Sequence, residues 1–500
     1  MSGGSLVRAG LIVSVVTLLG RVSGLVREMA LARSMGAGEE ADVAVLLLAL
    51  PDLLTQVLAA GAIVAVLLPV YQAAGVASPE SAALFRRFTA WALGLGLCLG
   101  AGVWAGTSLV LLVLAPGFSE WQQGQAAAGL AVVAWTLPIA IASAVTAAWL
   151  QAQSRFVIVT AGTLLFNGAV IAALLLAPGS FTALGAGLVA AVSVRWTSQV
   201  IALGRVAWQK GPIALVSLPD GLWRRYAEAT GAAAVVFAAP LVARALASLA
   251  SDGTVAVLHY ATRVLEVPMG LAIGVVPVVL FPKLSAAFSA NNQPRFHTLL
   301  SDGWIGMVAL SVPVAGTLLV FGDVAARAVF ALSGFEETAV SAIGQSIALG
   351  AVGLPALGAA FLYQSALNAR LDTRGPLIAS AVYLGLLVVS GRPAVAAGGG
   401  AGLVLALSAC QWALAGVLAW RLWRVHDLPP VSGAMVAPAA WVAVGTVTVV
   451  TVAGWLVRGA SVWPRLIAAA GAGAAALALS IGVLNRAGLP LPWKGGARAL

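Results

Sequence analysis

Long apolar stretches alternate with short polar or turn-forming segments along almost the whole chain. A helix of roughly 20 mostly apolar residues crosses the hydrocarbon core of a bilayer, and most of these stretches are longer than that. They are also far longer than the ~10-residue alternating strands of a membrane β-barrel. The pattern therefore predicts an all-α polytopic membrane protein with 14 transmembrane helices. The predicted spans lie at 8–34, 41–73, 88–115, 124–152, 156–178, 182–207, 224–250, 254–286, 297–322, 337–369, 376–393, 398–423, 433–457 and 462–485.

The composition excludes a soluble fold. Of the 500 residues, 61% are hydrophobic and only 9% are charged, whereas about a quarter of the residues of a soluble domain are charged. The net charge of +10 comes from basic residues in short loops between apolar spans. That pattern reflects membrane topology, so we expect no nucleic-acid partner. Cys98 and Cys410 lie far apart in apolar spans and form neither a metal-binding nor a disulfide pattern.

The distribution of lysine and arginine between alternate loops predicts the orientation of the chain. With a cytoplasmic N-terminus, 16 basic residues fall on the cytoplasmic side and only five on the other, namely Arg33, Arg327, Arg392, Arg458 and Arg465. Cytoplasmic loops of membrane proteins carry this kind of excess. Because the predicted number of spans is even, we expect both termini in the cytoplasm.

Short sequence motifs recur at an offset of 212–217 residues, which corresponds to six spans. Val43-Ala44-Val45-Leu46 recurs as Val255-Ala256-Val257-Leu258, and Leu137-Pro138 recurs as Leu354-Pro355. Because six is even, both copies have the same orientation in the membrane, which predicts a parallel repeat typical of transporters. We expect a six-helix N-terminal lobe at 1–210, a six-helix C-terminal lobe at 222–426 and two additional helices at 431–487.

Several charged residues lie inside the predicted spans, where charge is costly and usually functional. Five of the nine are arginines, whose planar guanidinium binds phosphate oxygens through two parallel hydrogen bonds and stays charged at physiological pH. The pattern favours a binding site for an anionic, phosphate-bearing headgroup. The nine residues are Arg21, Arg27, Glu28, Asp42, Asp52, Arg195, Arg244, Arg263 and Glu266.

Three of these arginines, Arg21, Arg27 and Arg263, are the main candidates for substrate binding. Arg21 and Arg27 are separated by six positions, which places them about 120° apart around the helix and about 9 Å apart along its axis. Arg263 and Glu266 are three positions apart and can form an ion pair. His259 shares a helix face with Arg263, where we expect it to line the cavity and form hydrogen bonds.

Each embedded arginine has an alternative role, in which a carboxylate of the protein neutralises it and the pair serves helix packing. This alternative is favoured for Arg195 and Arg244.

Sequence motifs of enzymes are absent from the chain. It has no P-loop, no zinc-binding spacing and no nucleophile elbow. We therefore expect a transporter rather than an enzyme, with no catalytic residues, no metal site and no cofactor. Its energy would come from an ion gradient, from the membrane potential, or from the supply and removal of substrate.

Several segments resemble the MurJ/MviN lipid II flippases of the multidrug/oligosaccharidyl-lipid/polysaccharide (MOP) exporter superfamily. The stretch 20–28, with Arg21, Gly24, Arg27 and Glu28, is similar to the signature of that family's first helix. The resemblance extends over the first twelve spans, and the last two agree in number only. The other similar segments are Gly36-Ala37-Gly38 with Asp42, Leu50–Leu54, Tyr260–Gly270 and Asp372-Thr373-Arg374-Gly375-Pro376.

The resemblance implies a function and places residues in it. It implies a flippase of the bacterial cytoplasmic membrane that moves lipid II, a polyprenyl-diphosphate-linked glycan, to the outer leaflet by alternating access. Arg21, Arg27 and Arg263 would line a central cationic cavity, and the last two spans would hold the polyprenyl tail in a groove. Proteins of cell-wall or polysaccharide assembly are the partners to expect. The residues assigned to the gate or the cavity wall are Glu28, Asp42, Glu266 and His259, with Asp42 near the periplasmic gate.

The chain also departs from the family pattern. Thr55 and Gln56 stand where the family typically has arginines, Ala60 replaces an acid, and Arg244 stands where an aspartate is common. These departures leave open a related flippase for another lipid-linked oligosaccharide, of exopolysaccharide or O-antigen type. A cation-coupled multidrug exporter of the same superfamily would favour embedded carboxylates over arginines. A membrane scaffold for glycan assembly, without transport, is a further alternative.

Overall fold

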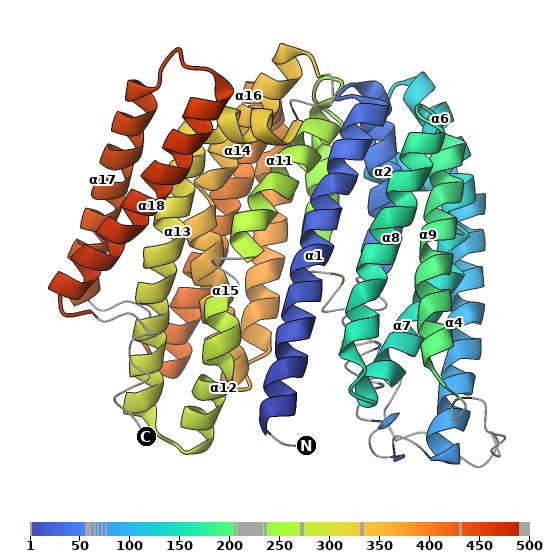
Figure 1. The fold of residues 1–500 in the computed structure, drawn as a ribbon, viewed down its shortest axis with the longest axis horizontal. Helices are drawn as coiled ribbons and strands as arrows, with labels where there is room; N and C mark the ends of the chain where they lie inside the picture. Colours follow the sequence, from blue (N-terminus) through green and yellow to red (C-terminus); the bar gives the residue numbers. More distant parts are fainter. Residues whose placement is uncertain are drawn as a thin grey trace. The chain divides into compact units, whose positions relative to one another are not determined.

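A computed structural model describes residues 3–55, 78–204, 238–270, 275–330, 335–429 and 433–489, together with a few isolated positions. Within these residues all regular structure is helical (Figure 1). The chain divides into two compact units, Met1–Ala256 and Val257–Leu500. The predicted boundary between the lobes, 211–221, lies outside the described residues.

Unit 1 is built around α8, which packs against both α1 and α9 (Figure 1). α7 crosses to α4 and α9, and α2 contacts α6. Ser119 starts α6 with a capping box, in which its side chain and that of Gln122 satisfy each other's backbone N–H groups. The helices are α1 (Gly3–Met35), α2 (Glu39–Thr55), α4 (Pro79–Ala105), α5 (Thr107–Leu114), α6 (Glu120–Val133), α7 (Thr136–Ala152), α8 (Phe156–Leu176) and α9 (Phe181–Ala202).

Unit 2 is organised around two long helices. α13 is kinked at Phe321, and α16 is broken at Gly398 and Gly399, where Gly399 has a φ of +55° that favours glycine. α11 begins in unit 1 and continues into unit 2. The helices are α11 (Thr254–Pro268), α12 (Val275–Ser289), α13 (Gln293–Phe330), α14 (Glu337–Ala351), α15 (Leu354–Ala369), α16 (Arg374–His426), α17 (Gly433–Leu456) and α18 (Val462–Arg486).

The prediction of an all-α polytopic membrane protein is confirmed. Seven described helices are long and apolar enough to cross a membrane, or up to nine if each of two bent helix pairs forms one span. A described helix overlaps each predicted span, and α16 covers two of them, 376–393 and 398–423. In the seventh predicted span, 224–250, the described helix is the short apolar segment Ala238–Ala247.

The repeat predicted from short motifs appears in the internal geometry of both units. The pair α6 and α7 is bent by 44°, and the pair α14 and α15 is bent by 45°. Glu120 and Glu337, which start the two pairs, are 217 positions apart, as are the last residues, Ala152 and Ala369. Two residues after each end, the chain takes a left-handed conformation, at Ser154 (φ 60°) and Leu371 (φ 62°). The same break at the same position in both copies is typical of the discontinuous helices of transporters.

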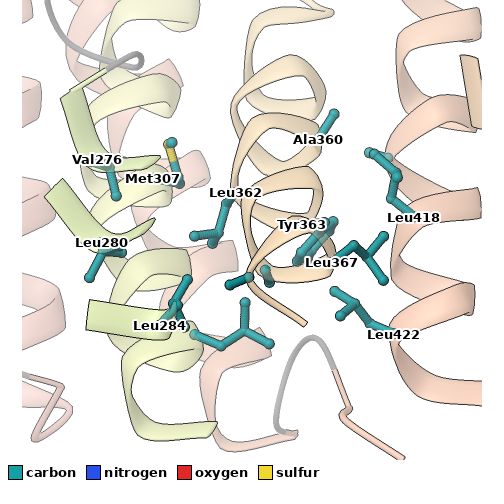
Figure 2. Close-up of a cluster of buried hydrophobic side chains, with 14 of the residues drawn as sticks. Val276, Leu280, Leu284, Met307, Ala360, Leu362, Tyr363, Leu367, Leu418 and Leu422 are labelled. Atoms are coloured by element: carbon teal, nitrogen blue, oxygen red, sulfur yellow. The ribbon is translucent and has the colours of Figure 1, made fainter. Parts of the chain in front are cut away.

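The core of unit 2 lies around α15 (Figure 2). Leu362 of α15 points toward α12 and α13, where it meets Leu280 and Met307, whereas Leu367 points toward Leu418 of α16. Because lipid tails are as apolar as leucine, close packing rather than the hydrophobic effect holds such helices together in a bilayer. α15 therefore serves as the central packing element of its unit.

The two C-terminal helices, α17 and α18, pack against each other and against α13 (Figure 1). Glycines bring these helices into close contact. A Cβ on Gly316 of α13 would lie 2.5 Å from Thr446 of α17, and a Cβ on Gly473 of α18 would lie 3.2 Å from Thr317 of α13. Asp323 of α13 and Arg465 of α18 form an ion pair at 2.7 Å. Small residues at such contacts are a common feature of helix packing in membranes.

Candidate functional site

The candidate site residues lie on three helices. Arg21, Arg27 and Glu28 are on α1 and Asp42 is on α2, all in unit 1. The other three are in unit 2, on α11, namely His259, Arg263 and Glu266.

Arg27 is buried between α1 and α8. Its side chain is only 7% exposed and that of Glu28 is 1% exposed. Nη2 of Arg27 donates to Oε1 of Glu28 at 2.7 Å, and Nη1 donates to Oδ1 of Asn167 on α8 at 3.3 Å. The third donor, Nε, is buried and has no hydrogen-bond partner in the described part of the chain. A charge in such a place is costly, and the ion pair with Glu28 offsets part of that cost.

Asn167 of α8 holds this arrangement together, although sequence analysis did not single it out. Its Nδ2 donates to the Ser23 hydroxyl at 2.9 Å and to the Gly20 carbonyl at 3.3 Å, both on α1. The same amide thus binds the α1 backbone through its nitrogen and Arg27 through its oxygen. An asparagine in the middle of an apolar span was the available signal, because buried amides in membranes need partners.

Arg21 differs from Arg27 in its surroundings. It lies on the same helix, and the structure leaves it exposed. Among the described residues it forms no ion pair, so its five donors remain available to a ligand.

Asp42 of α2 caps the first turn of α11. Its Oδ2 accepts from the Gly253 N–H at 2.8 Å and its Oδ1 accepts from the Ala256 N–H at 2.7 Å. These are the two donors that a capping box normally satisfies, and a carboxylate at a helix N-terminus is also favoured by the helix dipole. Gly253 has a φ of +82°, and a Cβ there would lie 2.3 Å from the Ala37 carbonyl oxygen. Asp42, which is 2% exposed, therefore ties the first turn of α2 to the start of α11.

On α11, Arg263 and Glu266 form the ion pair that their spacing predicted. Nη1 of Arg263 lies 2.8 Å from Oε2 of Glu266, and the two side chains are 29% and 43% exposed. His259 is buried, and its ring contacts that of Tyr260 edge-on at 6.0 Å between centroids. Tyr260 in turn packs against Phe330 at 5.1 Å.

The structure gives few contacts for the other three embedded charges, Arg195, Arg244 and Asp52. The stem of Arg195 on α9 lies against Gly162 of α8, where a Cβ would be 3.1 Å from Arg195 Cγ. Arg244 is partly buried. The side chains of Asp52 and Thr55, and both Gln56 and Ala60, lie outside what the structure describes.

A partly buried ion cluster joins the two ends of α16 and is independent of these residues. Asp372, just before α16, accepts from Nε of Arg421 at 2.7 Å and from Nη2 at 3.0 Å. It also contacts Nε2 of His426 at 2.9 Å and accepts from the Gly375 N–H at 3.0 Å. Burial alone raises the pKa of Asp372, but the hydrogen bonds from Arg421, His426 and Gly375 outweigh it and hold the pKa well below its ordinary value. Sequence analysis included Asp372 in a family-like segment but did not predict these bonds.

The described residues contain no group of three or more His, Cys, Asp or Glu side chains that could hold a metal ion. The arrangement instead offers guanidinium groups and partner carboxylates inside apolar units, which suits the binding of an anion.

Comparison with known proteins gives the family. The family model of the lipid II flippase MurJ matches residues 31–465. A lipid II flippase MurJ from Burkholderia cenocepacia is 26% identical over 407 residues, 77% of each chain. A probable lipid II flippase MurJ from Rhizobium tropici is 25% identical over 403 residues, 76% of this chain and 73% of the relative. The match to a probable lipid II flippase MurJ from Rhizobium meliloti, 29% identical over 210 residues, spans only 39% of each chain.

Solved structures support the same fold. A lipid II flippase MurJ in its inward closed conformation has a TM-score of 0.82 at 17% identity, over 95% of this chain and 99% of that one. An inward-facing multidrug resistance MATE family transporter of the MOP superfamily has a TM-score of 0.66 at 14% identity, over 83% and 98%. At such identities the likeness concerns the fold alone, whereas the family model matches most of the sequence. On that match, from residue 31 to residue 465 of 500, the chain belongs to the lipid II flippase MurJ family.

Proposed function

We propose that this protein is a transporter that moves lipid II from the cytoplasmic to the outer leaflet of a bacterial cytoplasmic membrane. The observation that carries the proposal is the match of the lipid II flippase model to residues 31–465. The polytopic helical fold provides the membrane context. The excess of basic residues in alternate loops supports an orientation with both termini in the cytoplasm.

Three arginines bind the diphosphate of the substrate, namely Arg21, Arg27 and Arg263. All three lie on helices of the membrane-embedded units, where an uncompensated charge is costly. An arginine fork matches two oxygens of a phosphate group in a way that a lysine ammonium does not. Glu28 and Glu266 partner two of these arginines, and His259 lies one turn before Arg263 on α11.

Asp42 acts as a positioning residue of the gate. Because its carboxylate binds the first turn of α11, it holds the first turn of α2 against the start of that helix. α17 and α18 provide the groove for the polyprenyl tail. In support of this role, both present a largely apolar surface, with Trp441, Val444 and Ile467 among the exposed side chains.

The experiment is binding and transport of a polyprenyl-diphosphate glycan by the purified, reconstituted protein. Arg21→Ala, Arg27→Ala and Arg263→Ala should each lose affinity by roughly 10- to 150-fold, because a charge-assisted hydrogen bond contributes about 1.5–3 kcal/mol. Lysine at these positions should rescue binding only in part. Arg327→Ala is the matched control, since Arg327 pairs with the exposed Glu337 and a surface ion pair contributes little.

Equal affinity of all three alanine variants and the wild type would overturn the site assignment. The identity of the substrate is tested by letting lipid II and other polyprenyl-diphosphate glycans compete for binding to the protein. A protein that prefers another polyprenyl-diphosphate oligosaccharide to lipid II would contradict the proposed substrate and leave the arginine site in place.

A further inference from the structure

Two ion pairs of this protein, one buried in unit 1 and one partly buried in unit 2, use their arginines differently. In unit 2, Arg421 binds Asp372 with both donors of one guanidinium edge, Nε at 2.7 Å and Nη2 at 3.0 Å. In unit 1, Arg27 donates to Glu28 through Nη2 alone, at 2.7 Å. Its Nε is buried without an acceptor in the described part of the chain. Arg421 therefore binds its carboxylate through two hydrogen bonds, whereas Arg27 binds its carboxylate through one.

The burial of the Arg27 Nε–H group without an acceptor among the described residues costs free energy. A buried donor without an acceptor has lost its water and gained nothing in exchange. A phosphate group presents several oxygens and can accept from Nε and Nη2 together. When a phosphate replaces Glu28, Arg27 gives up one hydrogen bond to a carboxylate and gains two to the phosphate.

Asn167 keeps the guanidinium in place during such an exchange. It accepts from Nη1, which lies on the other side of the guanidinium from Nε. Asn167 is itself held by Ser23 and Gly20 of α1. Orientation of the fork therefore does not depend on Glu28 alone.

We propose that Glu28 is a resident competitor of the substrate, which occupies half of the Nε–Nη2 edge of Arg27 and yields it to a phosphate group. This inference rests on the proposed function, in which Arg27 binds the diphosphate. By returning to Arg27, Glu28 promotes release of the substrate after translocation. A carrier needs such weakening, because binding that is too tight in both orientations slows release.

Unit 2 contains a second pair of the same kind. Arg263, the other paired arginine of the proposed site, contacts Glu266 of its own helix through Nη1 at 2.8 Å. Each unit thus pairs a proposed substrate arginine with an acid on the same helix. Glu266 is the corresponding competitor in unit 2.

The test measures binding of farnesyl diphosphate to the purified full-length protein by calorimetry, and transport by the same variants. Glu28→Gln keeps a hydrogen-bond acceptor but removes its charge. Because charge-assisted hydrogen bonds are roughly twice as strong as neutral ones, we expect roughly three- to tenfold tighter binding. Transport should become slower, since release is then limiting. Glu266→Gln, at a partly exposed pair, should also bind more tightly.

The controls separate this inference from the proposed function. Glu337→Gln removes the acid of an exposed Arg–Glu pair and should leave the affinity unchanged. If the wild type binds farnesyl diphosphate and Arg27→Ala loses it, while neither glutamine variant binds more tightly, only the competitor role fails. If the wild type and Arg27→Ala bind equally, the proposed site itself fails. Tighter binding with unchanged or faster transport would overturn the role in release.

Discussion

Oδ2 of Asp42 lies 2.8 Å from the backbone nitrogen of Gly253, 211 positions later in the chain. Asp42→Ala leaves the N–H groups of Gly253 and Ala256 without this acceptor. Loss of a helix cap costs about 0.5–2 kcal/mol, so we expect a lower Tm of the detergent-solubilised protein and reduced transport. Glu40→Ala, at an exposed position two residues earlier, is the control and should change neither. Identical melting of Asp42→Ala and the wild type would contradict the capping role.

Gly253 is the other half of this contact and should tolerate no side chain. Gly253→Ala combines a left-handed φ of +82° with a Cβ placed 2.3 Å from the Ala37 carbonyl oxygen. Gly36→Ala is a matched control, because Gly36 has a similar φ of +72° but open space around its Cβ position. The strain of a left-handed residue alone costs about 1–2 kcal/mol. We expect Gly253→Ala to lower the Tm clearly more than Gly36→Ala. Equal Tm shifts in the two variants would mean that the loop at Gly253 can move away from the loop at Ala37 at little cost.

We expect Asn167 to be important for transport because it positions Arg27. Asn167→Ala removes the acceptor of Arg27 Nη1 and both contacts to α1, which are worth about 1–3 kcal/mol if the groups stay buried and unpaired. We expect lower thermal stability and a strong loss of diphosphate binding. Thr160→Ala on the same helix is the control, since the Thr160 hydroxyl donates to the Phe156 carbonyl of its own helix. Full binding by Asn167→Ala would show that Arg27 is positioned without it.

The Asp372 cluster predicts a dependence of stability on pH. Because the pKa of Asp372 is lowered in the folded protein, its stabilising effect is present above the ordinary aspartate pKa of about 3.9. The effect is lost as the pH falls toward the folded pKa. At neutral pH we expect Asp372→Asn to have a lower Tm than the wild type, with the difference shrinking as the pH falls from about 5 to 3. A difference that stays constant over this range would contradict the role of the ionised carboxylate.

The helices and the repeat could be predicted because apolar length and proline-anchored motifs are local features of the sequence. Leu137-Pro138 and Leu354-Pro355 correctly indicated that two segments are equivalent. The matching bends of 44° and 45° were not predicted, since a break inside a continuous apolar stretch leaves little trace in its hydropathy. The predicted spans 376–393 and 398–423 correspond to the two parts of α16, which is broken at Gly398 and Gly399.

The candidate site was predictable only at the level of residue type. Embedded arginines stand out because charge is rare in a span, and the spacing of Arg263 and Glu266 gave their ion pair directly. The partner of Arg27 in α8 lies 140 positions away, and no local pattern encodes such a contact. The backbone N–H groups that bind Asp42 could not be predicted either, since the side chains of Gly253 and Ala256 do not contribute to the contact.

The polyprenyl groove proposed at α17 and α18 can be tested with a charge. Val444 of α17 is 57% exposed and Ile467 of α18 is 73% exposed. An arginine in the hydrocarbon region costs about 2.5–3.5 kcal/mol at a helix centre, and a lipid tail bound next to it would have to remove its remaining water. We expect Val444→Arg or Ile467→Arg to abolish transport while farnesyl diphosphate, whose tail is short, still binds. Val389→Arg on α16, where the side chain is 74% exposed, carries the same insertion cost outside the proposed groove and should keep transport. Equal loss in all three variants would attribute the effect to insertion, and full transport by both groove variants would remove α17 and α18 from the substrate path.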